Sequence, residues 1–173
     1  MKPISLLFLC VVALALAGCS KPTVVESAPL DWDGLPVPTK AQPKLPTLKL
    51  YVGPETLDAE VAVTPMEEKT GMMFRTNIQD SDAMIFDLHM PTRASFWMKN
   101  CPESISAAYI TPDGVIAEIH RLLANDTNPV LSAEPNIQYV LETSDGWFAR
   151  HHVTTGMAIT TENGPLRQAF NQR

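Results

Sequence analysis

The chain has 173 residues, of which 45% are hydrophobic and 18% are charged, and its formal net charge is −6 at pH 7. This length allows one ordinary domain with an additional segment. Because acidic proteins are repelled by phosphate-rich surfaces, the charge argues against a nucleic-acid-binding protein and against electrostatic docking on anionic lipid.

The N-terminus has the pattern of an exported bacterial lipoprotein. Lys2 precedes an apolar run over residues 4–17, which is shorter than the ~20 residues of a membrane-spanning helix. Leu16-Ala17-Gly18-Cys19 resembles a lipobox, which implies cleavage before Cys19 and acyl chains such as palmitate on that residue. Ser20 favours the outer membrane, on its periplasmic side, over retention in the inner membrane. An uncleaved anchor or an ordinary signal peptide is the alternative.

Composition then divides the chain into four parts. Residues 1–18 are the expected signal peptide, and residues 19–46, with six prolines from position 20 onward, are expected to be a lipidated tether. Trp32 within this tether either docks on the domain or a partner, or is idle. Residues 47–162 are expected to form a β domain, and residues 163–173 a loose C-terminal tail. Cleavage would shift the net charge from −6 to −7, because it removes Lys2 and no acid.

The β domain is predicted from alternation of apolar and polar residues with a period of two. Thr64-Pro65-Met66-Glu67 is a capping box that predicts one short helix, ended by Gly71. A single helical turn is expected over residues 147–151. The fold class is therefore mainly β, at the margin of α+β: a small antiparallel, barrel-like domain with one short helix plugging one end. The expected strands cover residues 48–52, 59–63, 84–88, 94–99, 105–110, 115–120, 137–142 and 157–160.

The stretch Ala94-Ser95-Phe96-Trp97-Met98-Lys99-Asn100 holds the candidate site. As a strand it turns Phe96 and Met98 to the core, and it sets Trp97 beside Lys99 on the other face. The donors of arginine and lysine beside a flat indole suit a carboxylate, a phosphate or a sugar. The alternative is a structural ion-pair network with a packed Trp. The candidate ligand-binding residues are Arg75, Trp97, Lys99, Asn100 and Glu142.

The remaining chemistry-bearing residues support no catalytic, metal or cofactor assignment. After cleavage and lipidation Cys101 has no cysteine partner in the chain, so it is either a small buried hydrophobe or a reactive thiol. His89, His120, His151 and His152 form no tight ligand motif, although His120 with His151 or His152 and Cys101 could meet in a soft metal site. A thiol mechanism would need a base beside Cys101, which the local sequence does not supply.

In chain order the motifs resemble the domain of unknown function family numbered 192. The resemblance is carried by residues 64–75, Ala83-Met84-Ile85-Phe86, Phe96-Trp97-Met98-Lys99-Asn100 and Tyr139-Val140-Leu141-Glu142, and it spans about residues 48–160. It implies a compact, mainly β fold that is often exported, and it implies no established activity. Two positions depart from the family pattern: Cys101 stands where the family has Thr, and Ser106 stands where it has Asp. If that Asp pairs with the motif Arg or Lys in relatives, Asp87 or Glu142 is the available substitute here.

The sequence thus predicts an envelope lipoprotein, anchored to the membrane through its N-terminal lipid, without a cofactor. We expect a non-catalytic module that binds a small anionic or polar ligand, or an envelope protein, and no nucleic acid. The alternatives are a hydrolase-like envelope enzyme that uses Glu142 or Cys101, and a purely structural scaffold module.

Overall fold

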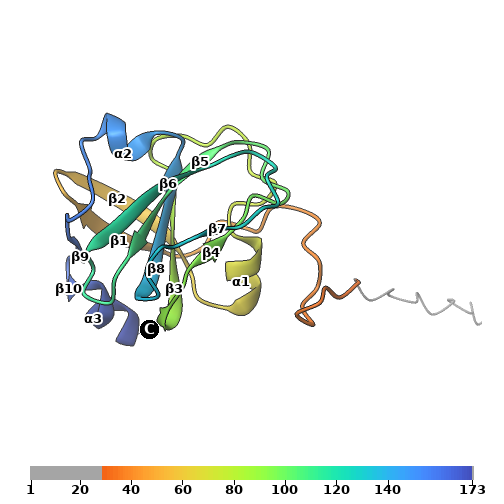
Figure 1. Ribbon diagram of the computed structural model, residues 1–173, viewed down its shortest axis with the longest axis horizontal. Helices are drawn as coiled ribbons and strands as arrows, with labels where there is room; N and C mark the ends of the chain where they lie inside the picture. The colour runs from red at the N-terminus through yellow and green to blue at the C-terminus, as the bar shows by residue number, and fades with distance from the viewer. Residues whose placement is uncertain (1–28, 173) are drawn as a thin grey trace, which may run out of the picture.

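The computed structural model describes residues 29–172 (Figure 1). The expected signal peptide and the lipidated Cys19 lie outside the described residues. Across residues 29–172 there is no helix of the length and apolarity that a membrane span requires.

A curled half-barrel sheet organises the fold. Its eight strands lie in the order β10-β9-β1-β2-β3-β8-β5-β6, and neighbours run antiparallel except for β2 and β3, which run parallel. The mainly β, mostly antiparallel domain predicted from the sequence is therefore confirmed. The strands are β1 (Thr47–Val52), β2 (Glu55–Ala62), β3 (Ala83–Thr92), β5 (Ile105–Ile110), β6 (Ile116–Leu122), β8 (Ile137–Ser144), β9 (Ile159–Thr161) and β10 (Gly164–Pro165).

The curl brings the turn between β5 and β6 against the segment that enters β9. The Ile116 N–H donates to the Met157 carbonyl at 2.9 Å, and the Ile159 N–H donates to the Gly114 carbonyl at 2.8 Å. Gly114 has φ +82°, and a Cβ atom there would lie 2.8 Å from the Ile159 carbonyl oxygen. A glycine is thus required where the two ends of the sheet approach each other.

Within residues 29–172 three short helices accompany the sheet, where the sequence predicted one helix and one further helical turn. In α1 (Pro65–Thr70) the capping box forms as expected: Thr64 Oγ1 accepts from the Glu67 N–H, and the Glu67 carboxylate accepts from the Thr64 N–H. The turn expected at residues 147–151 is α2 (Trp147–Arg150). Residues 163–173 are not a loose tail, because they include β10 and α3 (Leu166–Asn171), whose Leu166 and Ala169 are buried.

The predicted strand at residues 94–99 is shorter than expected. Only β4 (Ser95–Phe96) is extended, and it pairs with β7 (Val130–Leu131) in a separate two-stranded sheet. The chain then turns at residues 99–100, where the Cys101 N–H donates to the Met98 carbonyl, and the Met98 N–H donates to the carbonyl of Asp126 in a neighbouring loop. The alternation of burial still holds, since Met98 is buried while Trp97 is 37% exposed.

The central strands are buried on both faces, so the domain has two hydrophobic clusters. Ile85 and Leu141 pack into the larger one, and Met84 and Val140 pack into the other, which residues 72–73 and 98–101 cover. Strand side chains alternate, so Glu142 points to the same face as Val140. The sheet therefore carries a carboxyl group into the second cluster.

The described part of the expected tether, residues 29–46, lies against the domain. Gln42 Nε2 donates to the carbonyls of Glu67 and Gly71 at 3.2 and 2.9 Å, and the Val61 N–H donates to the Pro46 carbonyl. A bridge between Leu30 and Pro36 closes a small loop. This loop presents Trp32 beside α1.

Candidate functional site

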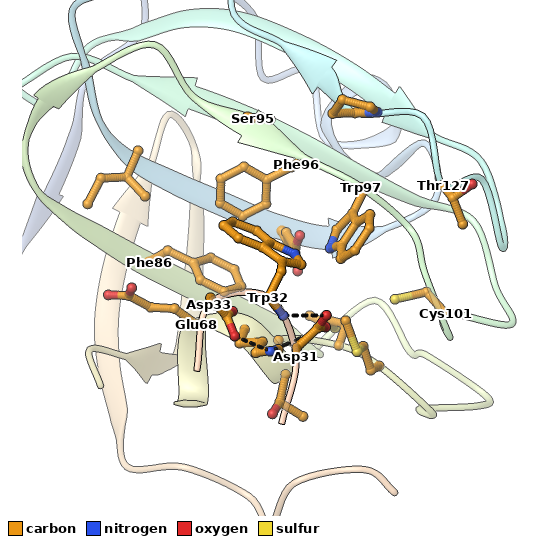
Figure 2. Close-up of a pocket in the computed structure, with 18 residues that line it drawn as sticks. Asp31, Trp32, Asp33, Glu68, Phe86, Ser95, Phe96, Trp97, Cys101 and Thr127 are labelled. Atoms are coloured by element: carbon orange, nitrogen blue, oxygen red, sulfur yellow. Dashed lines mark hydrogen bonds and ion pairs between the residues drawn. The ribbon is translucent and has the colours of Figure 1, made fainter. Parts of the chain in front are cut away.

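A cavity of about 600 Å³ opens between α1, β3, β4 and the loop of residues 31–33 (Figure 2). It joins six separate stretches of the sequence, and most of the side chains around it are apolar or aromatic. The lining residues are Asp31, Trp32, Asp33, Glu68, Lys69, Thr70, Gly71, Met72, Met73, Phe86, Leu88, Ser95, Phe96, Trp97, Cys101, Thr127, Pro129 and Glu142.

Aromatic rings form one wall and the mouth of the cavity. Phe86 on β3 and Phe96 on β4 meet edge to face, with ring centroids 5.2 Å apart. Trp97 lies further along the same wall, and Trp32, which is 87% exposed, reaches over the opening (Figure 2). An indole that the fold leaves this exposed is free to cover a bound molecule.

Glu142 is a polar residue buried in the wall of the cavity. Its residue is only 4% exposed, it lies on β8 between Met84 of β3 and Ala107 of β5, and its Oε2 has no hydrogen-bond partner within residues 29–172. Burial raises the pKa of this carboxyl to about 8, although the positive charge of Arg75 acts in the opposite direction. The group is therefore mainly protonated at pH 7.

Lys69 of α1 ties the mouth loop to the domain. Its Nζ lies 2.7 Å from Asp33 Oδ1 and 3.4 Å from Asp31 Oδ2, and its side chain is largely buried. The pKa of Asp31 is lowered by the hydrogen bond that its carboxylate accepts from the Trp32 N–H, and also by Lys69. Two carboxylates thus share one ammonium at the edge of the cavity.

Arg75 and Lys99, the two cations of the predicted site, do not converge on this cavity. Arg75 makes a bidentate pair with Glu60, at 2.6 and 2.8 Å, and lines a smaller pocket beside Lys44 and Asp82. Burial opposes ionisation of Glu60, but its hydrogen bonds from Arg75 and the Leu45 N–H outweigh burial and lower its pKa. Glu60 is thus the acid that pairs with Arg75, a role for which the sequence offered Asp87 or Glu142.

Lys99 and Asn100 stand outside the cavity and hold neighbouring segments. Lys99 Nζ is 4.0 Å from Asp31 Oδ2 and 5.2 Å from the centroid of the Trp97 ring. Asn100 has φ +61°, and its carbonyl accepts a 2.7 Å hydrogen bond from the Phe74 N–H. Of the five predicted site residues, the fold brings only Trp97 and Glu142 together.

Sequence reasoning missed most of the remaining cavity wall. The loop 31–33 lies in a proline-rich stretch, and the only signal was Trp32, for which docking on the domain was one of two readings. Met72, Met73 and Phe86 carry ordinary core patterns, which do not distinguish a cavity wall from a filled core.

Cys101 is buried, and His120 and His151 each lie beside a carboxylate. Burial, and then the charge of Glu142, raises the pKa of the Cys101 thiol to about 12. His120 pairs with Glu118 at 2.8 Å, and His151 lies 3.1 Å from Asp80. In the described part of the chain, no three His, Cys, Asp or Glu side chains are grouped closely enough to hold a metal ion.

Comparison with known proteins finds one family and several similar structures. Residues 49–161 match the family model DUF192, described as an uncharacterised conserved family. A protein of Sinorhizobium meliloti 1021, named as a candidate transcription regulator, is 28% identical with a TM-score of 0.61, over 66% of this chain and 91% of its own. A protein of unknown function from Novosphingobium aromaticivorans DSM 12444 is 28% identical with a TM-score of 0.63, over 69% and 89%.

A search of curated proteins found no match. The family match covers most of the chain, and it includes every strand of the half-barrel sheet from β2 to β9. The chain therefore belongs to the uncharacterised domain of unknown function family 192, as the order of its sequence motifs predicted.

Proposed function

We propose that this chain is a lipid-anchored envelope protein whose β domain binds a small, largely apolar molecule in the cavity beside α1. The observation that carries the binding proposal is the unpartnered Oε2 of Glu142, which is buried at the cavity wall. Such an atom normally costs about 1–3 kcal/mol, so a fold that keeps it beside an open cavity is arranged for a ligand that satisfies it.

The chemistry of the wall supports a small molecule over a structural role. Ligand cavities in proteins have volumes of roughly 300–1,000 Å³ and combine apolar or aromatic walls with a few polar groups, as this one does at about 600 Å³. Exposed Trp32 and Trp97 stand at its opening, where a scaffold module would have no need of them.

Binding is best tested with a neutral apolar fluorophore, 1-N-phenylnaphthylamine, titrated into the full chain. We expect saturable binding that Ser95→Trp weakens at least tenfold, because Ser95 lies exposed on β4 at the cavity rim. Thr160→Trp is the matched control, since Thr160 is also exposed but lies on β9 and does not line the cavity. Equal binding by both variants, or no saturable binding at all, would refute the cavity as the site.

The anchor is supported by the lipobox alone. Metabolic labelling with a radioactive fatty acid should label the protein in the envelope fraction, and Cys19→Ser should abolish the label. Label that survives this substitution would contradict lipidation at Cys19.

A hydrolase-like enzyme is the second candidate, favoured by the pKa of about 8 for Glu142, which suits a general acid near neutral pH. Cys101 suits the role of nucleophile poorly, because a thiol with a pKa of about 12 stays protonated. Turnover of ester, phosphate or glycoside substrates that Glu142→Gln abolishes would favour the enzyme. Nucleic-acid binding, suggested by the name of the Sinorhizobium relative, is not proposed, because the net charge of −6 opposes it.

A further inference from the structure

The ionisable side chains that line the cavity are predominantly acidic. Carboxyl groups of Asp31, Asp33, Glu68 and Glu142 line it, and among the described lining residues Lys69 is the one cation. Because Lys69 Nζ already lies within 3.4 Å of two of these carboxylates, its charge is locally compensated. An anionic ligand would therefore meet no uncommitted positive charge inside the cavity.

The nearby cations Arg75 and Lys99 do not add positive charge to the cavity, because each lies against other groups. Both guanidinium donors of Arg75 that face Glu60 are used in the bidentate pair. Lys99 stands near Asp31 and over the ring of Trp97, outside the cavity lining. The charge of the site is thus opposite to that of the carboxylate or phosphate site expected from the sequence.

We infer that the cavity recognises an organic ammonium ion, with its charged end at the Glu142 carboxyl and its apolar part against Trp97, Phe96 and Phe86. This inference rests on the proposed binding function and names its ligand class. Aromatic rings bury a large apolar surface, so they suit the apolar part of such a ligand.

Binding of a cation is coupled to a proton at Glu142. The titratable or charged groups that face it are Arg75, on the segment after α1, Cys101, after β4, and Tyr109, on β5. Burial keeps the Cys101 and Tyr109 groups neutral at pH 7, so they add no charge. When an ammonium ion that cannot itself lose a proton arrives, the Glu142 carboxyl releases its proton to solvent and the carboxylate pairs with the cation. Below its pKa of about 8, affinity should then rise about tenfold for each pH unit.

The test compares three benzyl compounds of similar size as competitors of the fluorophore on the full chain. Benzyltrimethylammonium carries a fixed positive charge, neopentylbenzene is its neutral isostere, and phenylacetate is an anion. We expect the cation to bind at least tenfold more tightly than the neutral isostere at pH 8, and the anion to bind most weakly. Between pH 6 and pH 7 the Kd of the cation should fall about tenfold, while that of the neutral compound stays within twofold.

Glu142→Gln should remove both the pH dependence and the preference for the cation over the neutral compound. The pH series on the unsubstituted protein gives the same answer should this variant fold poorly. Neutral and cationic compounds that bind equally would overturn the inference and leave the proposed binding function standing. If neither the fluorophore nor any of the three compounds binds, both this inference and the proposed binding function are refuted.

Discussion

Replacement of Glu142 by Gln should change how the stability of this domain depends on pH. The carboxyl lies on a strand that is buried on both faces, and its Oε2 has no hydrogen-bond partner in residues 29–172. Burial raises its pKa from 4.5 to about 8. Between these two pH values the folded state holds a proton that the unfolded chain has released, so folding is disfavoured progressively as the pH rises.

The size of the effect follows from the pKa. Stability falls by about 1.4 kcal/mol per pH unit where only the folded state is protonated. From pH 5 to pH 7 Glu142 should thus lower the free energy of unfolding by roughly 2.5 kcal/mol, and the decline should end above pH 8. His151, whose pKa is raised by Asp80, acts in the same direction, but its effect is common to both proteins and cancels in their difference.

The assay is urea unfolding followed by tryptophan fluorescence at half-unit steps from pH 5 to pH 9. Glu142→Gln should lose the slope and become more stable, relative to the unsubstituted protein, with each step up to pH 8. Glu162→Gln, which removes an exposed carboxylate, is the control and should follow the unsubstituted protein. A Glu142→Gln curve that runs parallel to that of the unsubstituted protein would refute the account of a protonated, unpartnered carboxyl.

Three further predictions concern other parts of the fold. Arg75→Ala leaves the Glu60 carboxylate buried without its bidentate partner and should lower the free energy of unfolding by about 3 kcal/mol. The double replacement Arg75→Met with Glu60→Met removes both charges and should lower it by less. Equal losses of the two variants in urea unfolding would contradict this. Leu166→Ala should cost about 2–4 kcal/mol because Leu166 is fully buried in α3, and a change below 0.5 kcal/mol would mean that the C-terminal residues do not pack. Cys101 should react with iodoacetamide at pH 7 at least a hundredfold more slowly in the folded protein than in urea, since its thiol is buried with a pKa of about 12. Rapid labelling of the folded protein would instead favour an enzyme that uses Cys101 as its nucleophile.

Local patterns predicted most of the secondary structure. The alternation of apolar and polar residues located the hairpin of β1 and β2, and Thr111-Pro112-Asp113-Gly114 located the turn between β5 and β6. Both features form between residues that are close in sequence, so local patterns are enough to predict them. The parallel pairing of β2 with β3 joins strands separated by a helix and a loop, and no local signal specifies it. Helix α3 was missed because it is short and begins after Pro165 at the end of the chain.

The site was only half predictable for the same reason. Trp97 and Glu142 were named because the motifs that contain them are conspicuous, and both line the cavity. The pairing of Arg75 with Glu60 is a tertiary contact between the segment that follows α1 and strand β2. The anion-binding hypothesis depended on the positive charge of Arg75, and this pairing takes that charge away from the site. Asp31 and Asp33 are held at the cavity by Lys69, a tertiary contact that composition cannot reveal.

The most direct measurement is a carbon-13 NMR titration of the Glu142 carboxyl, assigned by comparison with Glu142→Gln, with and without benzyltrimethylammonium. We predict a midpoint near pH 8 in the free protein and a midpoint more than two units lower when the cation occupies the cavity, as the tenfold change in Kd between pH 6 and pH 7 requires. A midpoint near 4.5 that the cation leaves unchanged would show that Glu142 is solvated and takes no part in binding.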